Sequence, residues 1–497
     1  MLISDCSYRL GAPGLLTSQE LRDKGYKANN SLLDQRAALG WIKQHIEGFG
    51  GDSDNITVAG PVSCSFHLQS REPLFRRVII TSVTSLQMRP ISLCAAESSY
   101  DAAMLALGLH AVQREKRVRQ LVSMDMQALR SGLAGVPLAP TVDDDLPLDV
   151  HTFADVQCGN ARVAGRHWCE SVLIGDCKFD GSIFGLRLAK RKTSIADAFR
   201  RSIRRSLSYK AHAAESFLVA YNLLGDVSDD DAYERILHIA SDLAFYAATV
   251  AVSEQLHADV KMFVYRFNEP NPFPGQWQGY ATHGLDVAFL LQNFNHALQE
   301  PQRSLAERLA SDVFSFVHGE EPWSQWHCDT KQAAVFGPPG VRAVRKDEAA
   351  QVERRGIIWQ LAAEADLDTL LGAFMAFVQN KDAPQSTLPV KSSLKPVAQS
   401  SKSTADTFVM DNPAVNKSAA DMLPEGALTV DTLAGDTSSV DSLMESIHLQ
   451  GKVVEIRNEL KVTQSRADNL RQQLVEALLK QLEAVKAEIE RAKQVSC

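Results

Sequence analysis

The sequence lacks several features that would assign it to a specialised class of protein. Its eight cysteines never form a CxxC pair, which argues against a zinc ribbon or a thioredoxin-like site. No run of about 18 apolar residues occurs, so no membrane span is expected, and no apolar signal-peptide core follows the first methionine. The net charge of −8 gives no general reason to expect a nucleic-acid partner. We therefore expect a cytoplasmic protein without a bound metal or cofactor.

The composition is that of a globular protein followed by a segment of different composition. With 497 residues, 45% of them apolar and 23% charged, the chain is long enough to bury a large core. Near residue 380 the composition changes, and Ser, Thr, Ala and Pro replace aromatic residues. We predict a folded α/β domain over residues 1–380, a disordered linker over 381–445 and a separate segment over 446–497.

The C-terminal segment has the apolar spacing of a coiled coil. Between residues 449 and 492, apolar side chains alternate by four and three positions, with one stutter. They include Leu449, Val453, Ile456, Leu460, Leu470 and Leu474, followed by Leu478, Leu482, Val485 and Ile489. A lone amphipathic helix is the alternative, but it would expose this stripe to water. We therefore favour self-association, or pairing with a partner helix, through residues 449–492.

Residues 50–70 form the stretch around which the rest of the chain is organised. The β-branched run 56–59 follows a Gly/Asp/Asn turn and predicts a buried strand. Gly60 and Pro61 then lead into a helix, in which proline suits the first position. Residues 78–80 predict the next strand. The local pattern is therefore a strand, a glycine hinge, a helix and a second strand.

Apolar residues at helical spacing indicate further helices. Residues 30–47 predict an amphipathic core helix whose apolar stripe consists of Leu33, Ala37, Trp41, Ile42 and Ile46. Residues 187–210 are rich in Lys and Arg, which suits a nucleic-acid or nuclear-targeting segment. The helical spacing of Ile195, Phe199, Ile203 and Leu207 favours instead a solvated basic face over an apolar underside. Residues 301–378 are expected to be mostly helical.

The segments on both sides of Gly60 resemble the type B carboxylesterases, the cholinesterase-like branch of the α/β-hydrolases. They occur in family order as residues 8–11 (YRLG), 29–39 (NNSLLDQRAAL), 49–52 (FGGD), 67–70 (HLQS) and 73–75 (PLF). The resemblance covers roughly residues 1–325. It implies a mostly parallel sheet flanked by helices, a strand that ends at residues 8–11, and ester hydrolysis by a serine, a histidine and an acid.

Two parts of the family's machinery have no counterpart in this sequence. The family carries Gly-Glu-Ser-Ala-Gly after the strand 56–59, but Val62 stands where the serine is expected, and no G-x-S-x-G occurs. The family's preceding edge strands and glycine-rich oxyanion loop are also missing, so we expect an incomplete α/β-hydrolase fold with an unpaired or covered sheet edge. Ser63 lies three residues after Gly60 instead of two and is a weak substitute nucleophile. Cys64 also lacks the turn geometry.

The other two members of the family's triad have counterparts. Residues 173–184 resemble the segment that carries the acid, and the matching position is Asp180, with Asp176 as a local rival. Residues 279–290 resemble the segment that carries the general base, and the matching position is His283. Their order along the chain fits the hydrolase order of serine, acid and histidine. By this resemblance Asp180 orients His283 and His283 takes the proton of the nucleophile.

Three interpretations of function remain open. The first is a degenerate carboxylesterase with little or no ester hydrolysis. The second is a non-catalytic binding or scaffold protein, which could hold a small ester or an apolar ligand and self-associate through its coiled coil, since cholinesterase-like relatives include non-catalytic proteins. The third is an active serine esterase represented by an incomplete gene model.

Overall fold

The computed structural model describes residues 2–146, 148–327, 329–338, 340, 342–344 and 356–380. The chain divides into two compact units, Met1–Asn416 and Lys417–Cys497, and every described residue belongs to the first. The linker predicted over 381–445 and the coiled coil predicted over 446–497 lie outside the described residues, so both stay predictions.

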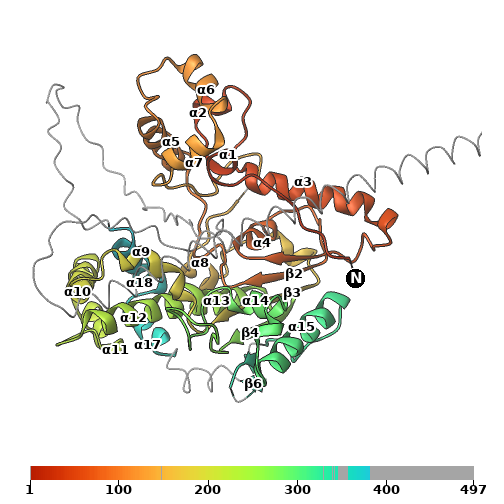
Figure 1. Cartoon of the computed structure of the whole chain (residues 1–497), viewed down its shortest axis with the longest axis vertical. Coiled ribbons are helices and arrows are strands. Elements are labelled where there is room, and N and C mark those ends of the chain that lie inside the picture. The colour runs from red at the N-terminus through yellow and green to blue at the C-terminus, as the bar shows by residue number, and fades with distance from the viewer. Residues whose placement is uncertain are drawn as a thin grey trace, which may run out of the picture. The chain divides into compact units, whose positions relative to one another are not determined.

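A sheet, six-stranded in the described residues, forms the centre of the fold (Figure 1). Its strands lie side by side in chain order: β1 (Thr57–Gly60), β2 (Arg77–Thr81), β3 (Ser171–Cys177), β4 (Lys261–Phe267), β5 (Ala333–Phe336) and β6 (Arg342–Val344). Strands β1 to β5 are parallel and β6 is antiparallel. The loops that follow the parallel strands therefore meet at one edge of the sheet, where α/β proteins place their sites.

The central strands are apolar on both faces because helices cover both. Val78 and Ile80 of β2 lie beside Val172 and Ile174 of β3, and all four are fully buried. Ile79 and Leu173 pack into the core on the opposite face. Such continuous β-branched runs are typical of a parallel sheet covered on both sides. The strand predicted around residues 78–80 is confirmed.

Strand β1 has only one neighbour in the described sheet. The predicted strand is therefore present, but the prediction that it is buried is wrong, because its side chains are half-buried and Ala59 is exposed. The predicted strand end at residues 8–11 is also wrong, because α1 (Gly11–Leu15) begins there. Arg9 instead forms an ion pair of 2.6 Å with Asp34, which ties this segment to a helix and not to a strand.

Helix α3 (Asn30–His45) has nearly the predicted bounds but buries a different face. The residues it buries are Ser31, Leu32 and Gln35, whereas the side chain of Trp41 is 53% exposed. Leu32 packs with Phe66 of α4 (Val62–His67) and with the segment around residue 146. The helix therefore faces α4, and its predicted apolar stripe is only half covered.

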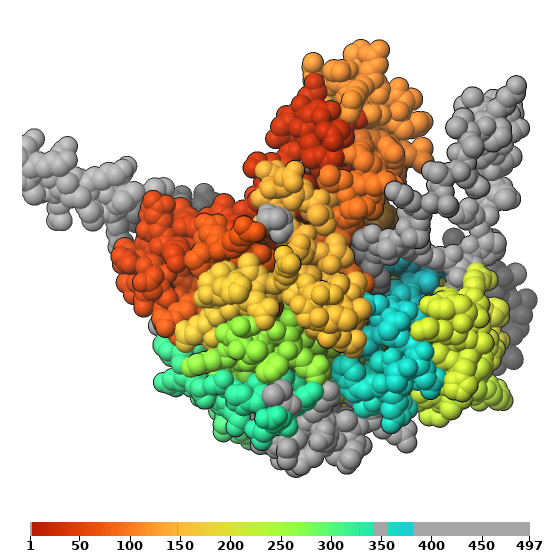
Figure 2. Space-filling view, turned by 180° about the vertical axis from the view of Figure 1, so that it is seen from behind, coloured from red at the N-terminus to blue at the C-terminus, as the bar shows by residue number. Residues whose placement is uncertain are grey.

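The core on one face of the sheet lies beneath a layer of helices. The layer comprises α8 (Phe153–Gln157), α9 (Gly185–Ala189), α10 (Ile195–Ser206), α11 (Ala211–Ala220), α12 (Asp229–Ala240), α13 (Ala247–Leu256), α17 (Ile357–Glu364) and α18 (Leu367–Val378). Ile195, Phe199, Ile203 and Leu207 are fully buried, which confirms the apolar underside of α10. Figure 2 shows α17 and α18 in cyan beside the yellow-green α10 and α11. Helices α14 (Leu285–Leu290) and α15 (Gln302–His318) cover the other face.

Residues 301–378 are only partly as predicted. Helices α15, α17 and α18 are present, but β5 and β6 also lie in this range and extend the sheet. Strand β5 is short and contains Ala333 and Ala334, so its sequence shows no alternation of apolar and polar residues that would predict a strand.

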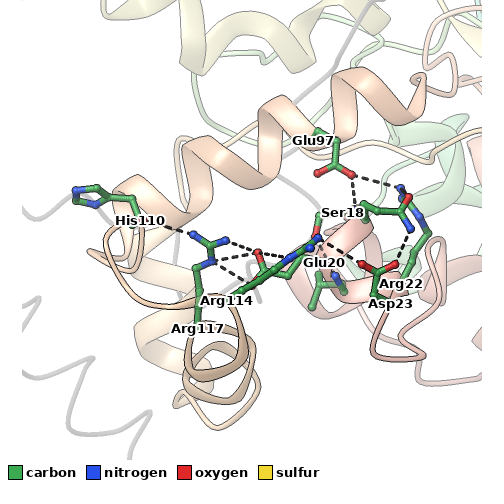
Figure 3. A network of polar contacts seen from close by, with 10 residues as sticks. Ser18, Glu20, Arg22, Asp23, Glu97, His110, Arg114 and Arg117 are labelled. Carbon is green, nitrogen blue, oxygen red and sulfur yellow. Dashed lines mark hydrogen bonds and ion pairs between the residues drawn. The ribbon is translucent and has the colours of Figure 1, made fainter.

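Five short helices form a cluster with an apolar core of its own. Helices α1, α2 (Gln19–Arg22), α5 (Leu93–Ala106), α6 (Arg114–Val122) and α7 (Met126–Gly132) surround Leu16, Leu21, Tyr100, Met104 and Leu121 (Figure 1). Figure 3 shows the polar network beside this core, in which Arg117 donates from Nε to buried Glu20 at 3.1 Å. Each acid there has an arginine partner, so the network is a structural feature.

One helical run in the described residues is long and apolar enough, by length and composition, to cross a membrane. It extends from Asp229 to Leu256, and 94% of its apolar window is buried inside the protein. Such burial is typical of the core helix of a globular domain.

Candidate active site

The loop after β3 places a carboxylate deep inside the protein. The strand ends at Cys177, and a 3₁₀ turn, η3 (Asp180–Phe184), follows. The side chain of Asp180 is fully buried, and its Oδ2 accepts a hydrogen bond of 2.8 Å from the backbone N–H of Cys177. This bond fixes the carboxylate and leaves Oδ1 for a second donor.

That second donor is His283, on the loop that follows β4. Its Nδ1 lies 2.7 Å from Oδ1 of Asp180, and its side chain is 25% exposed. The two loops are also joined through their backbones, because Phe179 N–H donates to Ala281 C=O at 2.8 Å. The backbone N–H of His283 donates to Ser182 Oγ at 3.1 Å. The structure thus brings together the two residues that the resemblance assigns as acid and base.

The contact with Asp180 determines both the tautomer and the pKa of His283. With Nδ1–H donating to Asp180, Nε2 is the nitrogen that could accept a proton from a nucleophile. Burial alone lowers the pKa of His283, but the hydrogen bond and charge of Asp180, with the charge of Asp286, outweigh it and raise the pKa above its ordinary value. Burial raises the pKa of Asp180, against the hydrogen bond and charge of His283.

Asp176, the rival acid, is occupied elsewhere. Its side chain is fully buried and forms an ion pair with Arg266 of β4, whose guanidinium also lies 4.3 Å from the ring centre of Tyr246. A buried carboxylate held by arginine is a structural ion pair. The geometry therefore associates Asp180, and not Asp176, with His283.

The turn between β1 and α4 offers no comparable constellation. Gly60 ends β1, and Pro61 caps α4 with a φ of −80°. Ser63 Oγ accepts its hydrogen bond, at 3.5 Å, from the side-chain amide of Gln35. An amide donor cannot take a proton from a hydroxyl, so this contact does not activate Ser63.

The neighbours of Ser63 on α4 are inert as well. Cys64 is buried, and burial raises the pKa of its thiol to about 12, so no thiolate forms near neutral pH. His67 is buried and shares Gln35 with Ser63, since its Nε2 lies 2.8 Å from Gln35 Oε1. Burial and the charge of Arg36 lower the pKa of His67 to about 3. His67 is therefore a neutral packing residue.

Sequence reasoning missed one hydroxyl, that of Ser82 directly after β2. Its φ is +60°, which is uncommon for a residue other than glycine, and the next N–H, of Val83, turns back to Thr81 C=O at 2.7 Å. Ser82 is 2% exposed, and its Oγ has no hydrogen-bond partner in the described part of the chain. The only signal was a Thr-Ser pair at the end of an apolar run.

A small cavity lies on the sheet face opposite α13. It holds about 10 Å³, and its lining includes Ile79, Leu173, Tyr265 and Asp286, but not His283. This volume suits about one water molecule and not an ester substrate.

Comparison with known proteins matches most of the described fold to one family. The model of the family described as "Carboxylesterase family" matches residues 2–336. The para-nitrobenzyl esterase of Bacillus subtilis is 23% identical over 366 residues, which cover 68% of this chain and 69% of that protein. Human neuroligin-2 is 33% identical over 163 residues, 30% of this chain and 19% of that protein.

The solved structures agree on the fold. A PNB esterase superimposes with a TM-score of 0.53 at 22% identity, covering 70% of this chain and 73% of that one. The chain thus spans less than three quarters of one esterase and a fifth of the neuroligin. At this identity the likeness concerns the α/β-hydrolase fold.

Proposed function

This chain belongs to the carboxylesterase family, and from that membership we propose that it retains the acid–base pair of an ester hydrolase but hydrolyses esters little or not at all. The observation that carries the proposal is the contrast between a hydrogen-bonded Asp180–His283 pair and a β1–α4 turn with Val62 where the family has serine. A general base without a nucleophile in reach has no proton to take.

The expected loss is large. In a well-studied triad enzyme, removal of the serine alone lowers kcat by about 10⁶. Nearby nucleophiles do not offset this loss, because Ser63 is bonded to an amide and Cys64 is a buried thiol. Misplacement of a nucleophile by about 1 Å already lowers a rate about 100-fold.

The test is hydrolysis of a short-chain nitrophenyl ester by the purified full-length chain. We expect turnover at the level of buffer, with no difference among the wild-type chain, His283→Ala, Ser63→Ala and Ser82→Ala. Turnover well above buffer that disappears in His283→Ala would overturn the proposal. Loss in one serine variant as well would then identify the recruited nucleophile.

A second outcome concerns the sequence at the turn itself. If the transcript encodes additional residues between Gly60 and Pro61 that complete G-x-S-x-G, the active-esterase interpretation replaces the degenerate one. Sequencing the transcript across these two residues decides this point independently of any assay.

A non-catalytic binding or scaffold function is the second candidate, favoured by the apolar spacing over residues 449–492. In this proposal the chain acts in the cytoplasm, associates through that segment and holds a small ester or apolar ligand in the esterase-like domain. Light scattering of the full chain, compared with a variant carrying Leu460→Lys and Leu474→Lys, tests the association. An unchanged mass would contradict it.

A further inference from the structure

A change of helical pitch occurs beside the Asp180–His283 pair. Between α12 and α13 the helix forms a π-helical turn, η5 (Ser241–Tyr246), and all six of its residues are buried. A π-turn inside an α-helix is rare and is frequently found at functional sites. The contacts of its residues indicate what this turn does.

Ser241, the first residue of this turn, contacts the backbone next to the acid. Its Oγ accepts a hydrogen bond of 2.9 Å from the N–H of Gly181 and donates one of 3.0 Å to Leu237 C=O. The approach is close: a Cβ on Gly181 would lie 1.9 Å from the carbonyl oxygen of Leu237. The backbone of the helix thus lies close against Gly181, the residue that follows Asp180.

The end of the same turn contacts the base and the partner of the rival acid. The ring of Phe245 lies 5.6 Å, centre to centre, from the ring of His283. The ring of Tyr246 lies 4.3 Å from the guanidinium of Arg266, which forms the ion pair with Asp176. One turn of helix therefore touches the surroundings of both acids and of the histidine.

We propose that the π-turn Ser241–Tyr246 is a positioning element that assigns Asp180 to His283 and keeps Asp176 with Arg266, with Ser241 as its key positioning residue. The hydroxyl of Ser241 fixes the N–H of Gly181 and hence the direction in which Asp180 leaves the backbone. An α-helical turn has one residue fewer for the same span and could not direct Ser241, Phe245 and Tyr246 to these three contacts together. The inference builds on the dyad of the proposed function but does not depend on turnover.

The same helix supplies a matched control. Ser253 of α13 is also fully buried, and its Oγ donates to the carbonyl four residues earlier, Thr249 C=O, at 2.8 Å. Ser241 and Ser253 therefore share burial and the bond to the preceding turn. Only Ser241 also accepts a bond from the segment that carries Asp180. Loss of either hydroxyl should affect the helix similarly, but only one loss should reach His283.

The experiment follows the titration of His283 by NMR in the full-length chain labelled at histidine, with His283→Gln used to assign the signal. Because Asp180 raises the pKa of His283, loosening their hydrogen bond must lower it. We expect Ser241→Ala to lower this pKa by about one unit and to weaken the downfield Nδ1–H signal. Ser253→Ala should leave both unchanged, and Ser241→Thr, which keeps the hydroxyl, should retain the wild-type titration.

The possible results separate a positioning role from a merely structural one. An unchanged titration in folded Ser241→Ala, or an equal shift in Ser253→Ala, would overturn the proposal. If Ser241→Ala does not fold, Ser241→Thr decides: a native circular-dichroism spectrum with a lowered pKa would also overturn it. Ester turnover is measured in the same samples, so failure of the proposed function is seen separately from failure of this inference.

Discussion

The loop after β3 and the turn after β1 occupy equivalent places at the same edge of the sheet but differ in how they are held. Asp180 is fully buried and receives N–H groups from Cys177 and His283. Among the residues that the structure describes, strand β1 has one strand beside it, and its side chains are half-buried. The helix that follows it places Ser63 against a side-chain amide. The side chains of the loop after β3 are therefore held from several sides, whereas those of the β1–α4 turn have fewer contacts in the described part of the chain.

Two glycine substitutions should give the largest difference in unfolding free energy between the two regions. Gly181→Ala would place a Cβ 1.9 Å from Leu237 O, a backbone atom that cannot rotate away, so we expect a loss of about 3 kcal/mol or more in unfolding free energy. Gly60→Ala would meet only Cys64 Sγ at 3.5 Å, an ordinary contact, and should change stability by about 0.5 kcal/mol or less. Urea denaturation of both variants measures the difference. Equal losses would contradict the contrast.

Changing a polar side chain should also lower the unfolding free energy more in the loop after β3 than in the turn after β1. The difference should be smaller than for the two glycines. Asp180→Asn retains the shape but replaces one acceptor by a donor that faces an N–H, which should lower the unfolding free energy by about 2–3 kcal/mol. Ser63→Ala removes a single long hydrogen bond and should change it by less than about 1 kcal/mol. Denaturant midpoints at neutral pH compare the two. A larger cost for Ser63→Ala would show that the β1–α4 turn is the more tightly held region.

The sequence predicts those parts of the fold and the candidate site that depend on local patterns, but not those that depend on contacts between distant residues. The strand around residues 78–80, the strand before Asp180 and the pairing of Asp180 with His283 follow from apolar runs and motif order. The choice of Asp180 over Asp176 needed Arg266, which lies about 90 residues away. The bond between Ser241 and Gly181 spans 60 residues and leaves no pattern in either segment. The buried face of α3 likewise depends on α4 and not on its own periodicity.

The pH dependence of stability should include a contribution from the Asp180–His283 pair. The folded pKa of His283 is raised, so the native state binds more protons than the unfolded state. Its contribution is therefore full below the unfolded histidine pKa of about 6.5 and is lost as pH rises through the raised folded pKa. The loss is about 1.4 kcal/mol for each unit by which the folded pKa exceeds the unfolded pKa. His283→Gln should flatten the curve above pH ~6.5, and an unchanged slope in this variant would assign it to other groups.

The smallest effect is expected from an attempt to restore the nucleophile. Val62→Ser places a hydroxyl on the first residue of α4, but the turn keeps Pro61 and lacks the second glycine of the family's motif. We expect no increase in nitrophenyl ester hydrolysis and no labelling by a fluorophosphonate. Labelling that also requires His283 would show that the two regions are already in register and that only the hydroxyl is missing.

The chain order of the strands also bears on how the protein folds. Since β1 to β5 lie side by side in the order in which they occur, each new strand can join the edge left by the previous one. The longest step between neighbouring strands is from β2, which ends at Thr81, to β3, which begins at Ser171, and the step from β3 to β4 is only slightly shorter. Helices α5 to α7 fall within the step from β2 to β3 and have a core of their own. Early formation of this helical cluster would shorten the loop that must close before β3 pairs, and would make its docking a determinant of the folding rate.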